Sequence, residues 1–167
     1  MKKQISTAQT PGNIQEVLRL LSESPEHLER LSTKRSDQEL HAPLGSGERS
    51  FKETLEHLIN FEARTSEAIT LALLANEPLV TRIHPERELG KLLQLEQFPF
   101  SDLLAYFKFR RSILLSVLNS LPDQKWSRVI RQEGKRRKES VYWQARTLSL
   151  HELEHLEDLE RKLEEKK

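Results

Sequence analysis

The sequence predicts an all-α fold, an up-down bundle of four helices that forms a single domain over residues 1–167. Apolar residues recur at the three- and four-residue spacing of a helix face in four separate segments. The chain contains only five glycines and seven prolines, which argues against a β fold with many turns. A length of 167 residues suits one ordinary domain.

The first helix is expected over residues 13–21, where apolar side chains line one face. Asn13 and Glu16 have the spacing of a capping box at its start. Ser24 followed by Pro25 resembles a second N-cap with a proline at the first helical position. The sequence therefore predicts that this helix is interrupted and restarts at Ser24.

A short turn at residues 36–40 and a loop at residues 42–47, which contains one proline and two glycines, precede the second long helix. That helix is expected to begin at Ser50, because Ser50 and Glu53 form another capping box. Its apolar pattern extends to about Ala75.

Residues 76–99 contain three prolines and one glycine and are expected to form a long connection, with one turn of helix at residues 89–95. A third helix should begin near Ser101 and end before Pro122, since leucine and phenylalanine residues repeat at helical spacing between them. A connection of this length is either functional or held by packing.

Residues 126–138 are polar and basic, and Gly134 marks a turn that would close a small hairpin before the last helix. The fourth helix, expected over residues 139–165, is the longest. Its line of apolar residues is interrupted at His151 and His155. Both imidazoles are therefore expected to face the bundle core.

The composition argues against several classes of protein. The formal net charge is +1 at pH 7, which gives no support to a globally basic nucleic-acid binder. Residues 125–138 hold seven basic residues and one acidic residue, but no groove-reading motif accompanies them, so no specific nucleic-acid binding is expected. The absence of cysteine excludes disulfides, cysteine-ligated zinc and a nucleophilic thiol in the chain.

The N-terminal residues 1–13 lack the apolar segment of a signal peptide, and the chain has no run of 18 apolar residues. The protein is therefore expected to be cytoplasmic and to have no membrane partner.

Three of the six histidines are candidates to bind one metal ion. His151 and His155 lie four residues apart, so both imidazoles project from one face of the fourth helix. His57, on the predicted inward face of the second long helix, supplies a third imidazole. Three nitrogen ligands leave a coordination position open, as in catalytic zinc sites. The alternative interpretation is a set of core or rim histidines hydrogen-bonded to carboxylates.

The segment from His151 to His155 also fits H-E-x-x-H, the signature of zinc metalloproteases. Such an enzyme needs a third ligand, normally downstream, yet only twelve residues follow His155. Asp158 and Arg161 stand where the longer metzincin motif has glycine and histidine, so the motif does not predict a protease. The remaining histidines, which have no partner at ligand spacing, are His27, His41 and His84.

Two segments resemble the DinB-like family. Residues 50–62 are similar to its capped helix with the pattern H-L-x-x-x-E, and residues 151–155 are similar to the H-E-x-x-H of its last helix. The order and separation of the two segments also agree with the family over most of the chain. Two positions depart from its pattern: Arg49 replaces a common tryptophan, and Leu156 with Glu157 replaces a frequent Arg-Gly pair.

This resemblance implies a four-helix bundle, often a homodimer, in which His57, His151 and His155 bind one divalent ion. Nickel and zinc are the common metals, and manganese and iron are further candidates. Some members are transferases or isomerases that use bacillithiol, mycothiol or glutathione. The expected function is that of a metal-dependent S-transferase, isomerase or hydrolase that acts on a small electrophile, with a low-molecular-weight thiol as possible cosubstrate. The alternative is a non-catalytic metal-binding bundle with a regulatory or interaction role.

Charged residues near the predicted site have candidate roles. Glu152 could act as a general base, and Glu62 and Glu154 could orient the imidazoles by accepting hydrogen bonds from them. Arg110 and Arg111 lie close to apolar residues of the third helix, so one of them could hold an anionic substrate. The other interpretation is that both extend from the apolar stripe to solvent.

Overall fold

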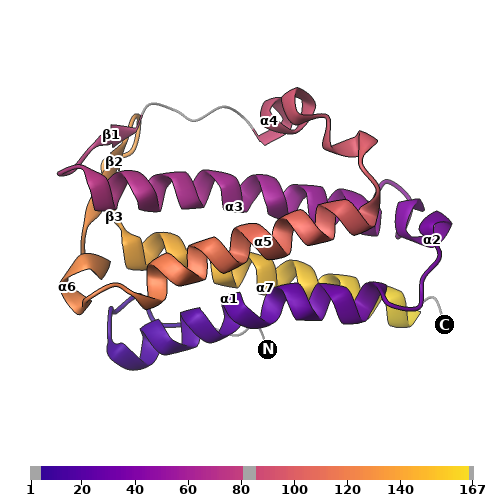
Figure 1. Ribbon diagram of the computed structural model, residues 1–167, viewed down its shortest axis with the longest axis horizontal. Helices are drawn as coiled ribbons and strands as arrows, with labels where there is room; N and C mark the ends of the chain where they lie inside the picture. The colour runs from indigo at the N-terminus through magenta and orange to yellow at the C-terminus, as the bar shows by residue number, and fades with distance from the viewer. Residues whose placement is uncertain (1–4, 81–85, 166–167) are drawn as a thin grey trace.

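Four long helices build the molecule, and short helices and strands connect them (Figure 1). The computed structural model describes residues 5–80 and 86–165. In chain order its elements are α1 (Pro11–Ser32), α2 (Asp37–His41), α3 (Phe51–Leu74), β1 (Leu79–Val80), α4 (Glu86–Leu93), a 3₁₀ turn (Leu95–Gln97), α5 (Phe100–Asn119), α6 (Asp123–Trp126), β2 (Val129–Gln132), β3 (Glu139–Ser140) and α7 (Val141–Glu165). The predicted four-helix bundle is confirmed, with α1, α3, α5 and α7 as its members.

The bundle helices run in two parallel pairs. α1 and α7 run in one direction, and α3 and α5 run in the other (Figure 1). The first residues of α3 and α5 agree with this, since the rings of Phe51 and Phe100 lie 5.4 Å apart. The long connection after α3 returns the chain to the end of the bundle where α3 began. The order of directions is therefore up, down, down, up, and α7 packs against both α1 and α3.

The predicted long connection between α3 and α5 contains more helix than expected. The single turn predicted at residues 89–95 is replaced by α4 followed by the 3₁₀ turn. The side chain of Leu95 is buried, and Lys52 Nζ donates to the backbone oxygen of Glu96 at 2.6 Å. Packing against α3 therefore holds the last part of the connection.

A small three-stranded sheet joins the end of α3 to the start of α7. β1 pairs with β2 in parallel, and β2 pairs with β3 in antiparallel orientation. The hairpin predicted around residues 126–138 is thus confirmed, and Gly134 at its turn has a φ of +78°, which favours glycine. A basic side chain of this region also serves the fold, because Arg128 donates to the backbone oxygens of Ala72 and Ala75 at the end of α3.

Two apolar clusters fill the bundle, one toward each end. Trp126 and Tyr142 belong to the cluster at the start of α7, and Phe51 and Phe107 belong to the cluster at the start of α3. Burial of apolar surface stabilises the fold by roughly 25 cal/mol per Å². Among the described residues, no helix is long and apolar enough to cross a bilayer.

The predicted interruption of the first helix is wrong, because α1 continues through Pro25. Proline has no amide hydrogen, so the backbone oxygen of Leu21 lacks the donor that the helix would supply four residues later. Arg111 replaces that donor, since its Nη1 donates to the Leu21 oxygen at 2.7 Å. A bond from a distant helix therefore satisfies the carbonyl at the point where α1 would be weakest.

Candidate metal centre

His57 lies two turns into α3, and a reciprocal cap fixes the start of that helix. Ser50 Oγ accepts a hydrogen bond from the amide of Glu53 at 3.0 Å, and a Glu53 carboxylate oxygen accepts one from the amide of Ser50 at 2.7 Å. The capping box predicted from the sequence is therefore confirmed. Because the cap sets where the helix begins, it also sets the face on which His57 lies.

The fold brings the three predicted ligand residues together. His57 Nε2 lies 2.9 Å from His151 Nε2 and 3.0 Å from His155 Nε2, and the ligand nitrogens of all three lie within 4.8 Å of one another. Two nitrogens bound to one ion at about 2.0–2.1 Å can be at most about 4 Å apart, so the two short separations fit a shared ion. In the part of the chain that the structure describes, no second such group of three ligand side chains occurs.

The imidazoles lie at the edge of the interface between α3 and α7, where they are partly buried, and do not face the core as expected. The inward line of α7 passes instead through Glu152, with 1% of its surface exposed, and Leu156, with 2% exposed. A glutamate thus occupies a core position, and this charged residue obscures the apolar period of the helix. The sequence consequently placed His151 and His155 in the core, whereas they lie half-buried beside it.

An aromatic ring covers one side of the cluster, and burial keeps the imidazoles of His151 and His155 neutral. Phe61, one turn after His57, stacks on His151 with ring centroids 4.0 Å apart. Burial, together with the neighbouring His155 and His57, lowers the pKa of His151 to about 4. Burial also lowers the pKa of His155, and the electrostatic interactions of its imidazole with His57 and Arg49 add to this effect. Both imidazoles are therefore neutral at pH 7, the form that coordinates metal ions.

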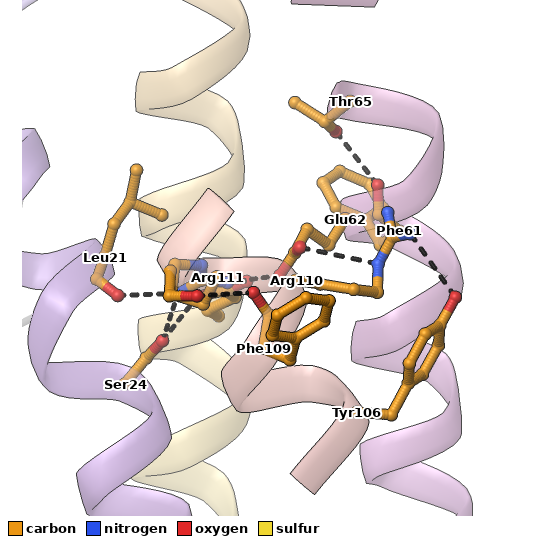
Figure 2. Close-up of polar contacts among 11 residues, drawn as sticks. Leu21, Ser24, Phe61, Glu62, Thr65, Tyr106, Phe109, Arg110 and Arg111 are labelled. Carbon is orange, nitrogen blue, oxygen red and sulfur yellow. Dashed lines mark hydrogen bonds and ion pairs between the residues drawn. The ribbon is translucent and has the colours of Figure 1, made fainter. Parts of the chain in front are cut away.

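A buried ion-pair network joins all four bundle helices (Figure 2). Arg111 of α5, with 1% of its surface exposed, donates from Nη2 to Glu62 of α3 at 2.8 Å and to Glu152 of α7. Its Nη1 donates to the hydroxyl of Ser24 at 2.6 Å and to the backbone oxygen of Leu21, both on α1. Ser24 in turn donates to the second carboxylate oxygen of Glu152 at 2.7 Å. Sequence analysis missed this network.

Because several charged residues belong to this network, they do not have the roles expected from the sequence. Both oxygens of Glu152 are engaged by Ser24 and Arg111, so its geometry gives no support to a general base at the histidines. Glu62 is fully buried; burial raises the pKa of its carboxyl, while the charge of Arg111 opposes that rise. Arg111 neither lines a cleft nor reaches solvent, because it belongs to the core. Arg110 lies 3.6 Å from Glu62, at the margin of the network.

Glu154 lies on the exposed side of the histidine cluster. Its negative charge partly counteracts the lowering of the pKa values of His151 and His155. Together with His155, Asp158 and Arg161, it lines a surface cavity of about 500 Å³. Solvent therefore reaches His155 from this side.

Two of the other histidines, His27 and His41, lie apart from the cluster. His27 lies 3.6 Å from a carboxylate oxygen of Glu160, and His41 Nδ1 lies 2.7 Å from the backbone oxygen of Asp37 in its own short helix. His84 lies outside the described residues. Neither His27 nor His41 contributes to the candidate site.

The comparison with protein families decides which family the sequence represents. A family model described as the DinB superfamily matches residues 8–159, a range that contains all three clustered histidines. The chain belongs to the DinB superfamily. The resemblance seen in the two histidine motifs is therefore confirmed. None of the curated proteins compared with this DinB superfamily member matches its sequence significantly.

A solved structure shares the fold of this DinB superfamily member. YfiT from Bacillus subtilis is similar with a TM-score of 0.82 and 17% sequence identity, over 96% of this chain and 93% of that chain. YfiT is described as a probable metal-dependent hydrolase with an unusual four-helix bundle topology. At this level of identity the likeness shows that the two chains share the bundle.

Proposed function

We propose that this DinB superfamily member is a metal-dependent enzyme that binds one divalent ion through His57, His151 and His155. The convergence of the three imidazoles supports the proposal. His57 is 94 and 98 residues from the other two in sequence, yet its Nε2 lies within 3.0 Å of both. Neutral imidazoles suit nickel and zinc, which we propose as the metals, and also iron. Three ligands leave a coordination position for a substrate.

The ion would supply Lewis acidity, which activates a thiol or a water molecule toward a small electrophile. The chain has no cysteine, so any thiol must enter as a cosubstrate. Phe61 keeps water from one face of His151 through its stacked ring. Glu154, on the exposed side, is the residue that we assign to accept the proton of the thiol or water. Glu152 receives no chemical role, because Ser24 and Arg111 already engage its oxygens.

Thiol transfer is the reaction that we expect. Protein loaded with nickel, zinc, manganese or iron should accelerate the attack of bacillithiol, mycothiol or glutathione on a small electrophile, and a chelator should abolish the gain. The assay follows loss of the electrophile with each thiol. Ester hydrolysis without thiol is measured in parallel, because YfiT is described as a probable metal-dependent hydrolase.

Glu154→Gln provides a test of the assigned proton acceptor in the same assay. The rate should fall while metal affinity stays unchanged, and Glu164→Gln, at an exposed position of the same helix outside the cavity that Glu154 lines, should leave both unchanged. Rates equal to the uncatalysed reaction in every combination, with metal bound, would contradict the enzyme. The non-catalytic metal-binding bundle would then be the better description.

We also propose a homodimer that forms through α5. Four large apolar side chains lie on the exposed surface of this helix at spacings of three or four residues: Tyr106, Phe109, Ile113 and Val117. Such a stripe matches a second copy of itself across a two-fold axis. Phe109, with 65% of its surface exposed, is its most exposed member.

Sedimentation velocity should give twice the chain mass of 19.6 kDa for the wild type and the single mass for Phe109→Lys. The control is Ser22→Lys, which adds the same charge at an exposed position of α1 and should stay dimeric. A monomeric wild type would reject the proposed dimer.

A further inference from the structure

A cavity of about 360 Å³ lies between α3, α7 and the hairpin formed by residues 129–140. This volume is within the range of small-molecule sites. Its walls include Phe61 and Arg64 of α3, Trp143 and Thr147 of α7, and Lys135 and Arg137 of the hairpin. None of the roles assigned so far uses this cavity.

The cavity is the neighbour of the histidine cluster along the same two helices. Phe61 follows His57 by one turn of α3, and Thr147 precedes His151 by one turn of α7. The ring of Phe61 lines the cavity and stacks on His151. A molecule held in the cavity would therefore lie one aromatic ring away from the candidate metal centre.

Arg64 is a cation of this cavity that lacks a partner. Within the described residues, no hydrogen bond or ion pair engages its guanidinium, and its Nε is buried without an acceptor. Buried donors in folded proteins are almost always satisfied, because removing them from water is costly. An anionic ligand in the cavity would supply the missing acceptor.

The other charges also make the cavity positive. Glu139, which is buried, is the carboxylate among the lining residues. Gln144, Lys135 and Arg137 donate to it at 2.7, 3.0 and 3.4 Å, so its charge is already engaged inside the protein. Three cations thus face the cavity with one neutralised acid.

Aromatic faces complete the lining. The guanidinium of Arg137 lies 3.8 Å from the ring centroid of Trp143, and Phe61 presents its ring on the side of the histidines. Arg137 and His151 each cover one face of these two rings, so a flat apolar group would pack against their remaining surfaces while an attached oxyanion contacts Arg64.

We propose that this cavity binds a small molecule that carries a carboxylate or phosphate group, with Arg64 as the main anion contact and Phe61 and Trp143 as the apolar walls. The role of this molecule as the substrate of the metal centre rests on the proposed function. The binding of the molecule does not rest on it, because none of the residues that line the cavity is a proposed metal ligand.

The test is a titration of the metal-free, full-length protein with benzoate, phenyl phosphate and benzamide, followed by the indole NMR signal of Trp143. Benzoate or phenyl phosphate should bind, and uncharged benzamide should bind about tenfold more weakly or worse. The two anions distinguish a carboxylate site from a phosphate site. Arg64→Gln should weaken anion binding about 10- to 100-fold.

The matched control is Arg136→Gln, which removes an equal charge from an exposed position of the same hairpin outside the cavity wall. It should change the affinity by less than about twofold. Arg64→Lys keeps the charge but loses the planar fork, so it should give an intermediate affinity. Circular dichroism and the melting temperature of each variant verify that it folds.

The proposal would be overturned if neither benzoate nor phenyl phosphate bound the wild type more tightly than benzamide does, or if the affinity of the better-bound anion were unchanged in Arg64→Gln. The first comparison needs no variant and so remains decisive even if a substitution unfolds the chain. Because the titration contains no metal, its result is independent of whether His57, His151 and His155 bind an ion. Failure of the anion site and failure of the proposed function are therefore distinguishable.

Discussion

Arg111→Met is expected to lower the free energy of unfolding by about 3–5 kcal/mol. Methionine fills much of the space, but Glu62 and Glu152 then remain buried without the cation that both now contact. The backbone oxygen of Leu21 also loses the donor that compensates for Pro25. Urea unfolding followed by circular dichroism measures the loss.

The matched control is Arg19→Met. Arg19 also has two carboxylate partners, Glu16 at 2.8 Å and Glu23 at 2.5 Å, but all three side chains lie on the surface. Exposed ion pairs contribute little, so the expected loss is below about 1 kcal/mol. Adding Glu62→Gln and Glu152→Gln to Arg111→Met should recover part of the lost stability, because the unpaired charges are removed with the cation. Equal losses of unfolding free energy for Arg111→Met and Arg19→Met would show that the buried network contributes no more to stability than a surface ion pair does.

His57→Ala is expected to weaken nickel or zinc binding by about a hundredfold or more. Removing a residue that only supports a ligand already costs about 10- to 100-fold, and His57 is itself a proposed ligand. His57 Nε2 is the atom that lies near both other imidazoles, at 2.9 and 3.0 Å. Equilibrium dialysis against metal buffers at pH 7 measures the affinity.

The melting temperature gives a second measure of the same site. A metal that binds only the folded state stabilises it by about 2.7 kcal/mol at a hundred times its dissociation constant. The resulting rise in melting temperature should shrink or vanish in His57→Ala, His151→Ala and His155→Ala. The control variants are His27→Ala and His41→Ala, whose histidines lie apart from the cluster, and His84→Ala, whose histidine is not a predicted ligand. A wild-type response in His57→Ala would remove it from the ligand set.

Local signals predicted the ends of α3 and α5, but not those of α1, which has Thr10 in place of Asn13 as its N-cap and continues through Pro25. The capping box of Ser50 and Glu53 is present, and α3 begins one residue after the expected position. The stripe of leucine and phenylalanine residues predicted α5, which ends at Asn119, before Pro122. These signals act within one or two turns, so a single sequence carries them. The direction of α5 was not accessible in this way, because it depends on how the connection after α3 crosses the bundle.

The buried ion-pair network could not be predicted from the sequence, for a different reason. Arg111, Glu62 and Glu152 each interrupt an apolar stripe, and an isolated charge at a core position is read as a break in the pattern. Only the packed bundle shows that the three charges lie at one level and contact each other. One clue was available: Pro25 inside a helical pattern leaves the oxygen of Leu21 without a donor.

The buried ion-pair network also restricts how the helices can shift along one another during folding. Leucine-rich faces tolerate alternative pairings, so packing alone would allow registers displaced by one turn, about 5.4 Å. In a displaced pairing of α3, α5 or α7, Arg111 would lie away from Glu62 or Glu152, and a carboxylate would be buried without a counter-charge at a cost of about 3–5 kcal/mol. The unpaired carboxylate therefore makes a bundle with a displaced helix register less stable than the native one. In the native register, His57 of α3 lies beside His151 and His155 of α7.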